Sequence, residues 1–277
     1  MSNTFYVIGV GPGDPELLTL KALRILRDVP CICVPKGSEE GNSLALSIVQ
    51  KALSLDNKEI IEAHFPMKKT KRAEEQKSAL RQAQGDTVMM SLSNHDELPL
   101  FRPSGLDTKW AETVKNILSR LNKGIDVAFI TLGDPAIYST FFYLYDRLLE
   151  SKPELKIDII PGVSSINASA AKAKISLGLA DEKIAILPAN YVENLKETLE
   201  KFDTVVLMKV NKVFEGIMHA LTEMNLLNNA IYISRAGMED EKVFKNIRDA
   251  KKEDLNYFSM IIVKKGACGA DKASPAH

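Results

Sequence analysis

The amino-acid sequence predicts an α/β protein made of two α/β domains with a cofactor cleft between them. Short apolar runs rich in β-branched residues alternate with segments of helical period along most of the 277 residues. This alternation is typical of βα units around a mainly parallel sheet. Turns that contain glycine and proline follow three of the predicted strands, and ligands of open α/β sheets bind beyond the carboxyl ends of strands. Because one of these turns lies past the predicted domain boundary, the three together predict a cleft between domains.

The first half begins with a predicted strand at residues 5–10. Asp14 is expected to cap the helix that follows, with Pro15 at its first position. Apolar residues between Leu17 and Leu26 recur at helical spacing and would supply the buried face of that helix. Further strands are expected at 29–34, 58–63 and 125–132, and further helices at 43–53, 110–121 and 141–149.

The second half has the same alternation at first and loses it toward its end. The last three strand-like runs have no helical segment between them, which indicates antiparallel pairing there. The predicted strands are 157–160, 183–187, 204–210, 230–234, 242–247 and 258–264, and the predicted helices are 165–174, 192–202 and 213–224.

The tripeptide Ser151-Lys152-Pro153 marks the predicted boundary, with an N-terminal domain at 1–152 and a C-terminal domain at 153–265. Residues 74–107 lose all periodicity, and a structureless stretch of about 30 residues is uncommon inside a compact domain. We interpret this segment as an inserted loop, with a mobile lid as the alternative. Residues 266–277 are expected to form a disordered tail.

Charge and composition argue against several classes of function. Thirty-six basic residues balance thirty-six acidic ones, whereas broad nucleic-acid binding needs a basic excess. No apolar run reaches the roughly 18 residues that span a bilayer, and the early glycines and prolines do not fit a signal peptide. Cys31, Cys33 and Cys268 lack metal-ligand spacing, and the first two are expected to be reduced core residues. We therefore expect a cytoplasmic protein without a metal.

The loop at residues 9–15, GVGPGDP, follows a strand and must be compared with the dinucleotide fingerprint G-x-G-x-x-G. The third glycine position is Asp14, whose carboxylate would repel a phosphate, and Pro12 has no amide hydrogen to donate. S-adenosylmethionine carries a sulfonium cation and no phosphate, so it suits this loop better, and glycine lets the backbone approach such a ligand closely. The alternative is a tight turn capped by Asp14 without any ligand.

Two more turns follow strand ends and point to the same crevice. The segment TLGDPAIY at 131–138 repeats the Gly-Asp-Pro sequence after the most apolar strand of the first half. The segment IPGVSS at 160–165 ends another strand, and Ser164 or Ser165 would cap a helix of small residues.

Taken together, these segments resemble the tetrapyrrole (uroporphyrin/corrin/diphthine) methylases. The matching segments are YVIGVGPGDPELLTLKAL, TLGDPAIYST, IIPGVSSINASAA, VVLMKV and SRAGMEDEKV, in the order and approximate spacing of the family. The resemblance spans residues 5–265 except 74–107, which departs from the family pattern. Within the family, VPKG at 34–37, FPM at 65–67 and LMKV at 207–210 are most similar to the precorrin-2 (cobalt-factor II) C-20 methyltransferases. A diphthine synthase or a siroheme-type methylase is less similar.

The resemblance implies S-adenosylmethionine as the cofactor, held largely by backbone groups of the three turns. Met208 would contribute a contact from LMKV, although core packing is the alternative role for this side chain. The SRAG segment would contribute one of two neighbouring residues. The implied cofactor residues are Pro12, Leu132, Gly133, Asp134, Ile137, Ser164, Ser165, Met208, and Ala236 or Gly237.

The reaction implied is methyl transfer to carbon 20, a bridging position of a reduced porphyrinoid. A sulfonium is a strong electrophile and the ring is electron-rich, so alignment can supply about 7–11 kcal/mol of the acceleration. One proton acceptor would complete the chemistry. Asp134 and Tyr138 are the candidate catalytic residues, because a helical start would place them on one face. In the alternative, Asp134 only caps a helix and Tyr138 packs against the cofactor.

A tetrapyrrole with carboxylates on its rim calls for basic residues in the cleft. Lys36, Lys209 and Arg235 lie near motif ends and are the candidate substrate-binding residues, although each also fits a solvated surface charge. Tyr138 or Phe65 could stack on the ring. The family resemblance further implies a homodimer. Two alternatives remain: a methyltransferase of the same fold acting on another corrin carbon or on uroporphyrinogen III, and a non-enzymatic module that binds a nucleotide or a protein.

Overall fold

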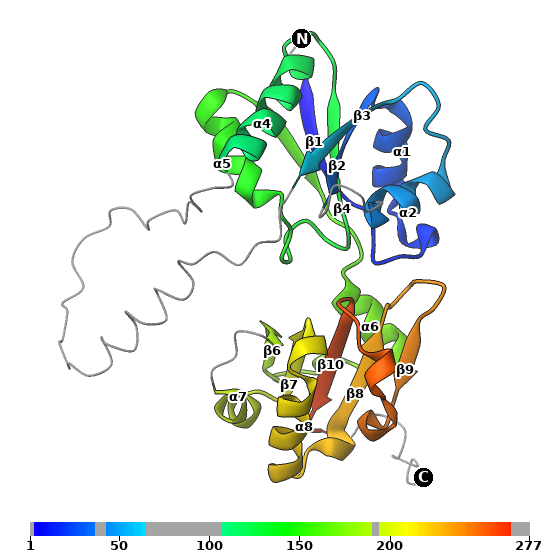
Figure 1. Cartoon of the computed structure of the whole chain (residues 1–277), viewed down its shortest axis with the longest axis vertical. Coiled ribbons are helices and arrows are strands. Elements are labelled where there is room, and N and C mark those ends of the chain that lie inside the picture. Colours follow the sequence, from blue (N-terminus) through cyan, green and yellow to red (C-terminus); the bar gives the residue numbers. More distant parts are fainter. Residues whose placement is uncertain (1–2, 37–42, 65–106, 190–193, 267–277) are drawn as a thin grey trace, which may run out of the picture.

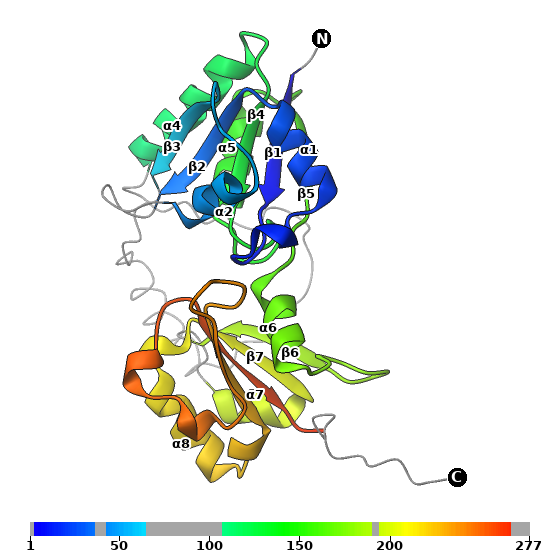
Figure 2. The same ribbon diagram turned by 90° about the vertical axis from the view of Figure 1, so that its right-hand side faces the viewer.

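The computed structural model describes residues 3–36, 43–64, 107–189 and 194–266. Two α/β halves lie one above the other, each built on its own five-stranded sheet (Figures 1 and 2). The predicted fold class is therefore confirmed. The predicted insertion at 74–107 lies outside the described residues apart from Asp107, as do Phe65 and the predicted tail apart from Gly266.

The first sheet is entirely parallel, as the βα alternation predicted, and its strand order is β3-β2-β4-β1-β5. Its central strands are mostly buried, and β4 completely so, because helices cover both faces, which is the usual setting of parallel strands. The strands are β1 (Thr4–Gly9), β2 (Cys31–Lys36), β3 (Glu59–His64), β4 (Val127–Thr131) and β5 (Lys156–Ile160).

Two pairs of helices cover the two faces of this sheet (Figure 1). Alternate residues of β1 face opposite sides, so Phe5 packs toward α4 (Asp107–Leu121) and α5 (Phe142–Ser151). Ile8 packs toward α1 (Leu20–Asp28) and α2 (Leu44–Ala52) on the other side. Cys31 and Cys33 are buried free thiols on the α4/α5 face, which confirms their prediction as reduced core residues.

The strand at 156–160 corrects the sequence prediction, which assigned it to the second half. β5 pairs with β1 in parallel along its length, from Lys156 opposite Thr4 to Ile160 opposite Ile8, so it is the edge strand of the first sheet. The chain therefore passes to the second sheet after Ile160. The local signal at Pro153 marks only the turn before this strand.

The segment after the first glycine loop forms a short 3-10 turn and a separate helix, where the sequence predicted one continuous helix. Asp14 caps only a 3-10 turn, η1 (Pro15–Leu17), where its carboxylate accepts the amide hydrogen of Glu16. Thr19 then caps α1 separately, since its hydroxyl accepts from the amide of Ala22 at 3.2 Å.

The second sheet has the order β6-β7-β10-β8-β9 and the antiparallel end that the sequence predicted. β10 runs antiparallel to both β7 and β8, and β9 runs antiparallel to β8. Helix α6 covers one face, and α7 and α8 cover the other. The elements are β6 (Ile184–Pro188), β7 (Thr204–Met208), β8 (Ala230–Ser234), β9 (Lys242–Phe244), β10 (Ser259–Lys264), α6 (Ser165–Ala173), α7 (Leu195–Lys201) and α8 (Phe214–Glu223). Short 3-10 turns are η3 (Val210–Lys212), η4 (Leu227–Asn229), η5 (Ile247–Asp249) and η6 (Lys252–Asp254).

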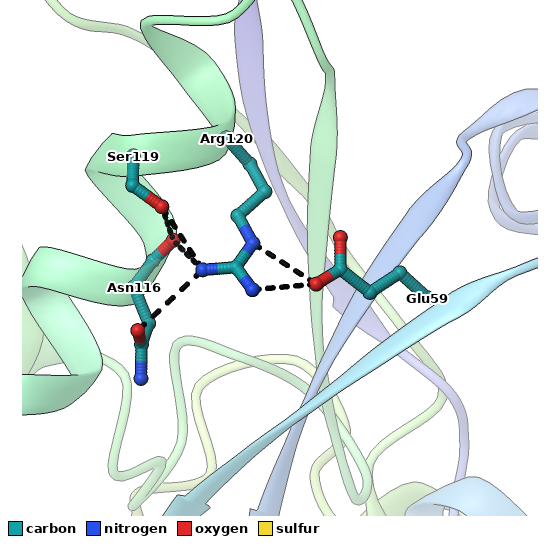
Figure 3. Close-up of polar contacts among 4 residues, drawn as sticks. All are labelled: Glu59, Asn116, Ser119 and Arg120. Carbon is teal, nitrogen blue, oxygen red and sulfur yellow. Dashed lines mark hydrogen bonds and ion pairs between the residues drawn. The ribbon is translucent and has the colours of Figure 1, made fainter.

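A polar network fastens α4 to the edge strand β3 (Figure 3). The Arg120 guanidinium donates to one carboxylate oxygen of Glu59, from Nε at 3.0 Å and from Nη2 at 2.5 Å. Its Nη1 donates to the Ser119 hydroxyl and to the carbonyl oxygen of Asn116, at 2.9 and 3.1 Å. This guanidinium lowers the pKa of the Glu59 carboxyl below its ordinary value.

No helix within the described ranges is long and apolar enough to cross a membrane.

Candidate functional site

Three turns at the carboxyl ends of β1, β4 and β5 meet backbone to backbone. Gly11 and Gly133 exchange hydrogen bonds, with Gly133 N donating to Gly11 O at 2.8 Å and Gly11 N donating back at 3.3 Å. Both glycines have positive φ angles, 80° and 71°, which other residues rarely adopt. A Cβ on Gly9 would lie 2.6 Å from Gly133 O and 2.7 Å from Gly162 N. The turns therefore fit together only because glycine stands at these contacts.

Asp134 ties the second turn to the third. Its Oδ1 accepts from the amide of Ala136 at 2.8 Å, and its Oδ2 accepts from the amide of Gly162 at 2.9 Å. The predicted helical start is wrong, because residues 134–140 form turns and α5 begins only at Phe142. Both carboxylate oxygens are engaged by backbone amides, which favours the positioning role of Asp134 over a catalytic one.

The first turn also contacts the second half of the chain. A Cβ on Gly13 would lie 2.6 Å from Met238 Cγ, and a Cβ on Gly237 would lie 3.1 Å from Pro12 Cγ. An ion pair between Lys51 and Glu239, at 2.6 Å, joins the halves nearby. The strand-end turns of the first sheet thus pack directly on the loop that follows β8.

A cavity of about 310 Å³ lies where these turns face the second sheet. Its size falls in the usual range for a site that holds a small molecule or cofactor, about 300–1,000 Å³. Every predicted cofactor residue lines this cavity except Gly237, which lies beside it against Pro12. The predicted residues in the wall are Pro12, Leu132, Gly133, Asp134, Ile137, Ser164, Ser165, Met208 and Ala236.

Ser169 is a wall residue that the sequence prediction missed. It lies on α6 and is fully buried, and its hydroxyl finds no hydrogen-bond partner within the part of the chain that the structure describes. A buried hydroxyl without a partner is unfavourable, and a polar ligand atom in the cavity would satisfy it. Position within a helix of small residues is a weak signal, so only the fold could single this residue out. Ser43, Met238, Tyr257, Phe258, Ser259 and Met260 also line the wall and were not predicted.

Tyr138 reaches from the first half to the second. Its φ angle is 53°, the residue is 49% exposed, and its hydroxyl donates to the carbonyl oxygen of Ile186 at 3.1 Å. Burial raises the pKa of the phenol above its ordinary value. The hydroxyl is therefore protonated at neutral pH, which makes it a donor and disfavours it as a proton acceptor.

The three predicted substrate-binding residues have different surroundings. Lys209 lines the cavity. Lys36 is bound to Glu62 at 3.0 Å, and Arg235 is bound to Asp240 at 2.5 Å, and neither belongs to the cavity wall. Within the described ranges, no three His, Cys, Asp or Glu side chains gather as a metal site would require.

Comparisons with known proteins agree with the sequence motifs. The sequence model of one protein family, the Tetrapyrrole (Corrin/Porphyrin) Methylases, matches residues 4–250. The cobalt-precorrin-2 C(20)-methyltransferase of Salmonella typhimurium is 31% identical over 267 residues, which cover 96% of this chain and 98% of that protein. A probable cobalt-precorrin-2 C(20)-methyltransferase of Methanocaldococcus jannaschii is 32% identical over 262 residues, which cover 94% and 95%.

The fold has solved counterparts as well. A uroporphyrin-III C-methyltransferase from Thermus thermophilus, complexed with S-adenosyl homocysteine, superposes with a TM-score of 0.55 at 19% identity. The match covers 95% of this chain and 92% of that one. At this level of identity the likeness concerns the two-domain fold alone.

Proposed function

This chain belongs to the tetrapyrrole (corrin/porphyrin) methylases, and from that premise we propose that it methylates carbon 20 of precorrin-2 or cobalt-factor II in cobalamin biosynthesis. Enzymes of this family take the methyl group from S-adenosylmethionine, so the chain is an S-adenosylmethionine-dependent C-methyltransferase. The observation that carries the choice of substrate is the identity to C(20)-methyltransferases over nearly the whole chain.

The polar and apolar side chains that line the cavity suit S-adenosylmethionine. Ser165 and Ser169 line the cavity together with apolar residues such as Ile137 and Met208, which fits a ligand with both a nucleoside and an aliphatic chain. The Ser164 hydroxyl is already bonded to Asn167, where it caps α6. The Ser169 hydroxyl lies in the same wall and forms no hydrogen bond within the described ranges. A phosphate would find no amide at Pro12. We therefore propose that the predicted wall residues hold the methyl donor.

The contribution of the protein is chiefly alignment. The bound donor supplies an electrophilic methyl group, and holding two reactants in line is worth about 7–11 kcal/mol. Asp134 fixes the second and third turns to each other through its two carboxylate oxygens. Tyr138 links the halves across the cavity through its bond to Ile186. A catalytic proton transfer by Asp134 or Tyr138 stays a prediction, and the engaged carboxylate and protonated phenol favour positioning roles.

Two further parts of the proposal are a homodimer, which the family resemblance implies, and a cytoplasmic location, which the sequence features led us to expect. The balanced charge of the chain supports small-molecule rather than nucleic-acid binding. Light scattering coupled to gel filtration measures the oligomeric state directly. A monomer at micromolar concentration would overturn the homodimer and leave the proposed reaction untouched.

The test of the reaction is product analysis with isotope-labelled donor. Precorrin-2 and cobalt-factor II are incubated separately with the enzyme and S-adenosylmethionine carrying a ¹³C-methyl group. We expect one labelled methyl group in the product, and carbon-13 NMR should assign it to carbon 20. Uroporphyrinogen III is the control substrate and should stay unmethylated. A label on another carbon, or methylation of uroporphyrinogen III alone, would refute the proposal.

A further inference from the structure

Lys209 stands between two tyrosine rings at the wall of the cavity. Its Nζ lies 5.8 Å from the ring centroid of Tyr138 and 5.8 Å from that of Tyr257. All three residues line the cavity, and Tyr138 and Tyr257 are 49% and 42% exposed, so this group lies at the open side of the site. The cavity thus has a cation flanked by two accessible aromatic surfaces.

The backbone holds this arrangement in place from both halves of the chain. Lys209 follows the last residue of β7 with a φ angle of 59°, and its amide donates to the carbonyl oxygen of Ser259 at 3.1 Å. Tyr138, from the first half, also has a positive φ angle. Residues other than glycine rarely adopt a positive φ angle. Those that do cluster at ligand sites, because the surrounding structure must hold the backbone in this conformation.

Within the described ranges, the charge of Lys209 has no carboxylate partner. Among the cavity-wall residues that the structure describes, Lys209 and Asp134 are the charged ones. Both Asp134 oxygens accept backbone amides, and no carboxylate in the described ranges forms an ion pair with Lys209. Lys36 and Arg235, by contrast, already have carboxylate partners. A half-buried lysine whose Nζ lies near two aromatic rings and forms no ion pair within the described ranges suits an anionic group brought by a ligand.

We propose that Lys209, Tyr138 and Tyr257 form the recognition site for the tetrapyrrole, with the ammonium bound to one rim carboxylate and the rings against the adjoining pyrrole face. This inference rests on the proposed function, which supplies a tetrapyrrole polycarboxylate as substrate. The amino-acid end of S-adenosylmethionine also has a carboxylate. The open side and the exposed rings favour the larger, flatter ligand, because stacking on the half-exposed tyrosines needs an aromatic surface of matching size.

The test measures two ligands on each variant of the full chain. Uroporphyrin III, a stable fluorescent tetrapyrrole polycarboxylate, is titrated by fluorescence, and S-adenosylmethionine is titrated by calorimetry. Lys209→Gln should raise the Kd for uroporphyrin III about tenfold, the loss expected for one hydrogen bond to a charged group. It should also flatten the dependence of that Kd on salt. Tyr257→Leu should weaken the same ligand several-fold, and neither variant should change the Kd for S-adenosylmethionine beyond about twofold.

Lys212→Gln is the matched control, because it removes the same charge three residues away on an exposed part of η3. It should bind both ligands as the wild type does. Unchanged uroporphyrin III binding in Lys209→Gln, an equal loss for S-adenosylmethionine, or no binding by the wild type would each overturn the proposal. Uroporphyrin III binding that depends on Lys209, in an enzyme that fails to methylate precorrin-2, would support this site while refuting the proposed reaction.

Discussion

Replacing Gly9 with alanine tests whether the close contact of the three turns creates the site. The added Cβ would lie 2.6 Å from Gly133 O, 2.7 Å from Gly162 N and 2.8 Å from Pro135 Cδ. An ordinary contact is at least 3.4 Å, so two backbone segments and a proline ring must all move. Gly9 does not have a positive φ angle, so the backbone conformation itself accepts alanine and the effect is steric.

The size of the effect follows from the atoms that must move. Overpacking of a well-packed region costs about 1–3 kcal/mol, and backbone atoms yield less readily than side chains. We expect the Tm to fall by at least about 2 °C, since one kcal/mol corresponds to about 2–4 °C in a chain of this size class. The Kd for S-adenosylmethionine should rise about tenfold or more, because the displaced turns line the cavity and 1.4 kcal/mol is a factor of about ten.

Differential scanning calorimetry and isothermal titration with S-adenosylmethionine measure the two quantities. The control is Gly216→Ala on α8, where an added Cβ meets nothing within 4 Å. This variant should gain about 0.5–1 kcal/mol from its helical position and keep its cofactor affinity. A Gly9→Ala protein with wild-type Tm and wild-type Kd would refute the reasoning. So would equal losses in both variants.

Three more predictions follow from contacts described above. Asp134→Ala removes the acceptor for two backbone amides, including that of Gly162, so calorimetry and steady-state kinetics should show cofactor affinity and kcat falling together, each about tenfold. A loss confined to kcat would instead support the catalytic role. Ser169→Ala removes a hydroxyl that has no hydrogen-bond partner among the described residues, so the Tm should hold or rise slightly while the Kd for S-adenosylmethionine rises about five- to tenfold. An unchanged Kd would contradict this assignment. Because Arg120 lowers the pKa of Glu59, the pair stabilises the fold above the ordinary carboxyl pKa, and this stabilisation is lost as the pH falls through the lowered value. The Tm of the wild type should exceed that of Glu59→Gln by about 1–3 °C at neutral pH, and the gap should close in acid; a gap independent of pH would argue against the ion pair.

Local patterns in the sequence determined most of the elements and the positions of the turns. Alternation of β-branched runs with helical periods predicted the strands and helices, and the absence of helices near the end predicted the antiparallel pairing of β10. These features depend on residues close in the chain, where apolar period and capping chemistry act directly. Most of the predicted cofactor residues lie in turns after β1, β4 and β5, so the topology of the first sheet brings them to one edge, whereas Met208 and Ala236 come from the second sheet.

Only the tertiary structure decided that β5 belongs to the first sheet and that the second carboxylate oxygen of Asp134 accepts from Gly162. It also decided which polar groups of the cavity lack a hydrogen-bond or ion-pair partner among the described residues. Strand 156–160 is a short apolar run that fits either sheet, and its pairing with β1 depends on residues about 150 positions apart in the chain. Likewise, it is the surroundings in three dimensions that leave the Ser169 hydroxyl without a hydrogen bond and Lys209 without an ion pair among the described residues. Sequence patterns encode what each segment prefers by itself, whereas strand pairing and the satisfaction of buried polar groups are settled by contacts between segments that no local pattern contains.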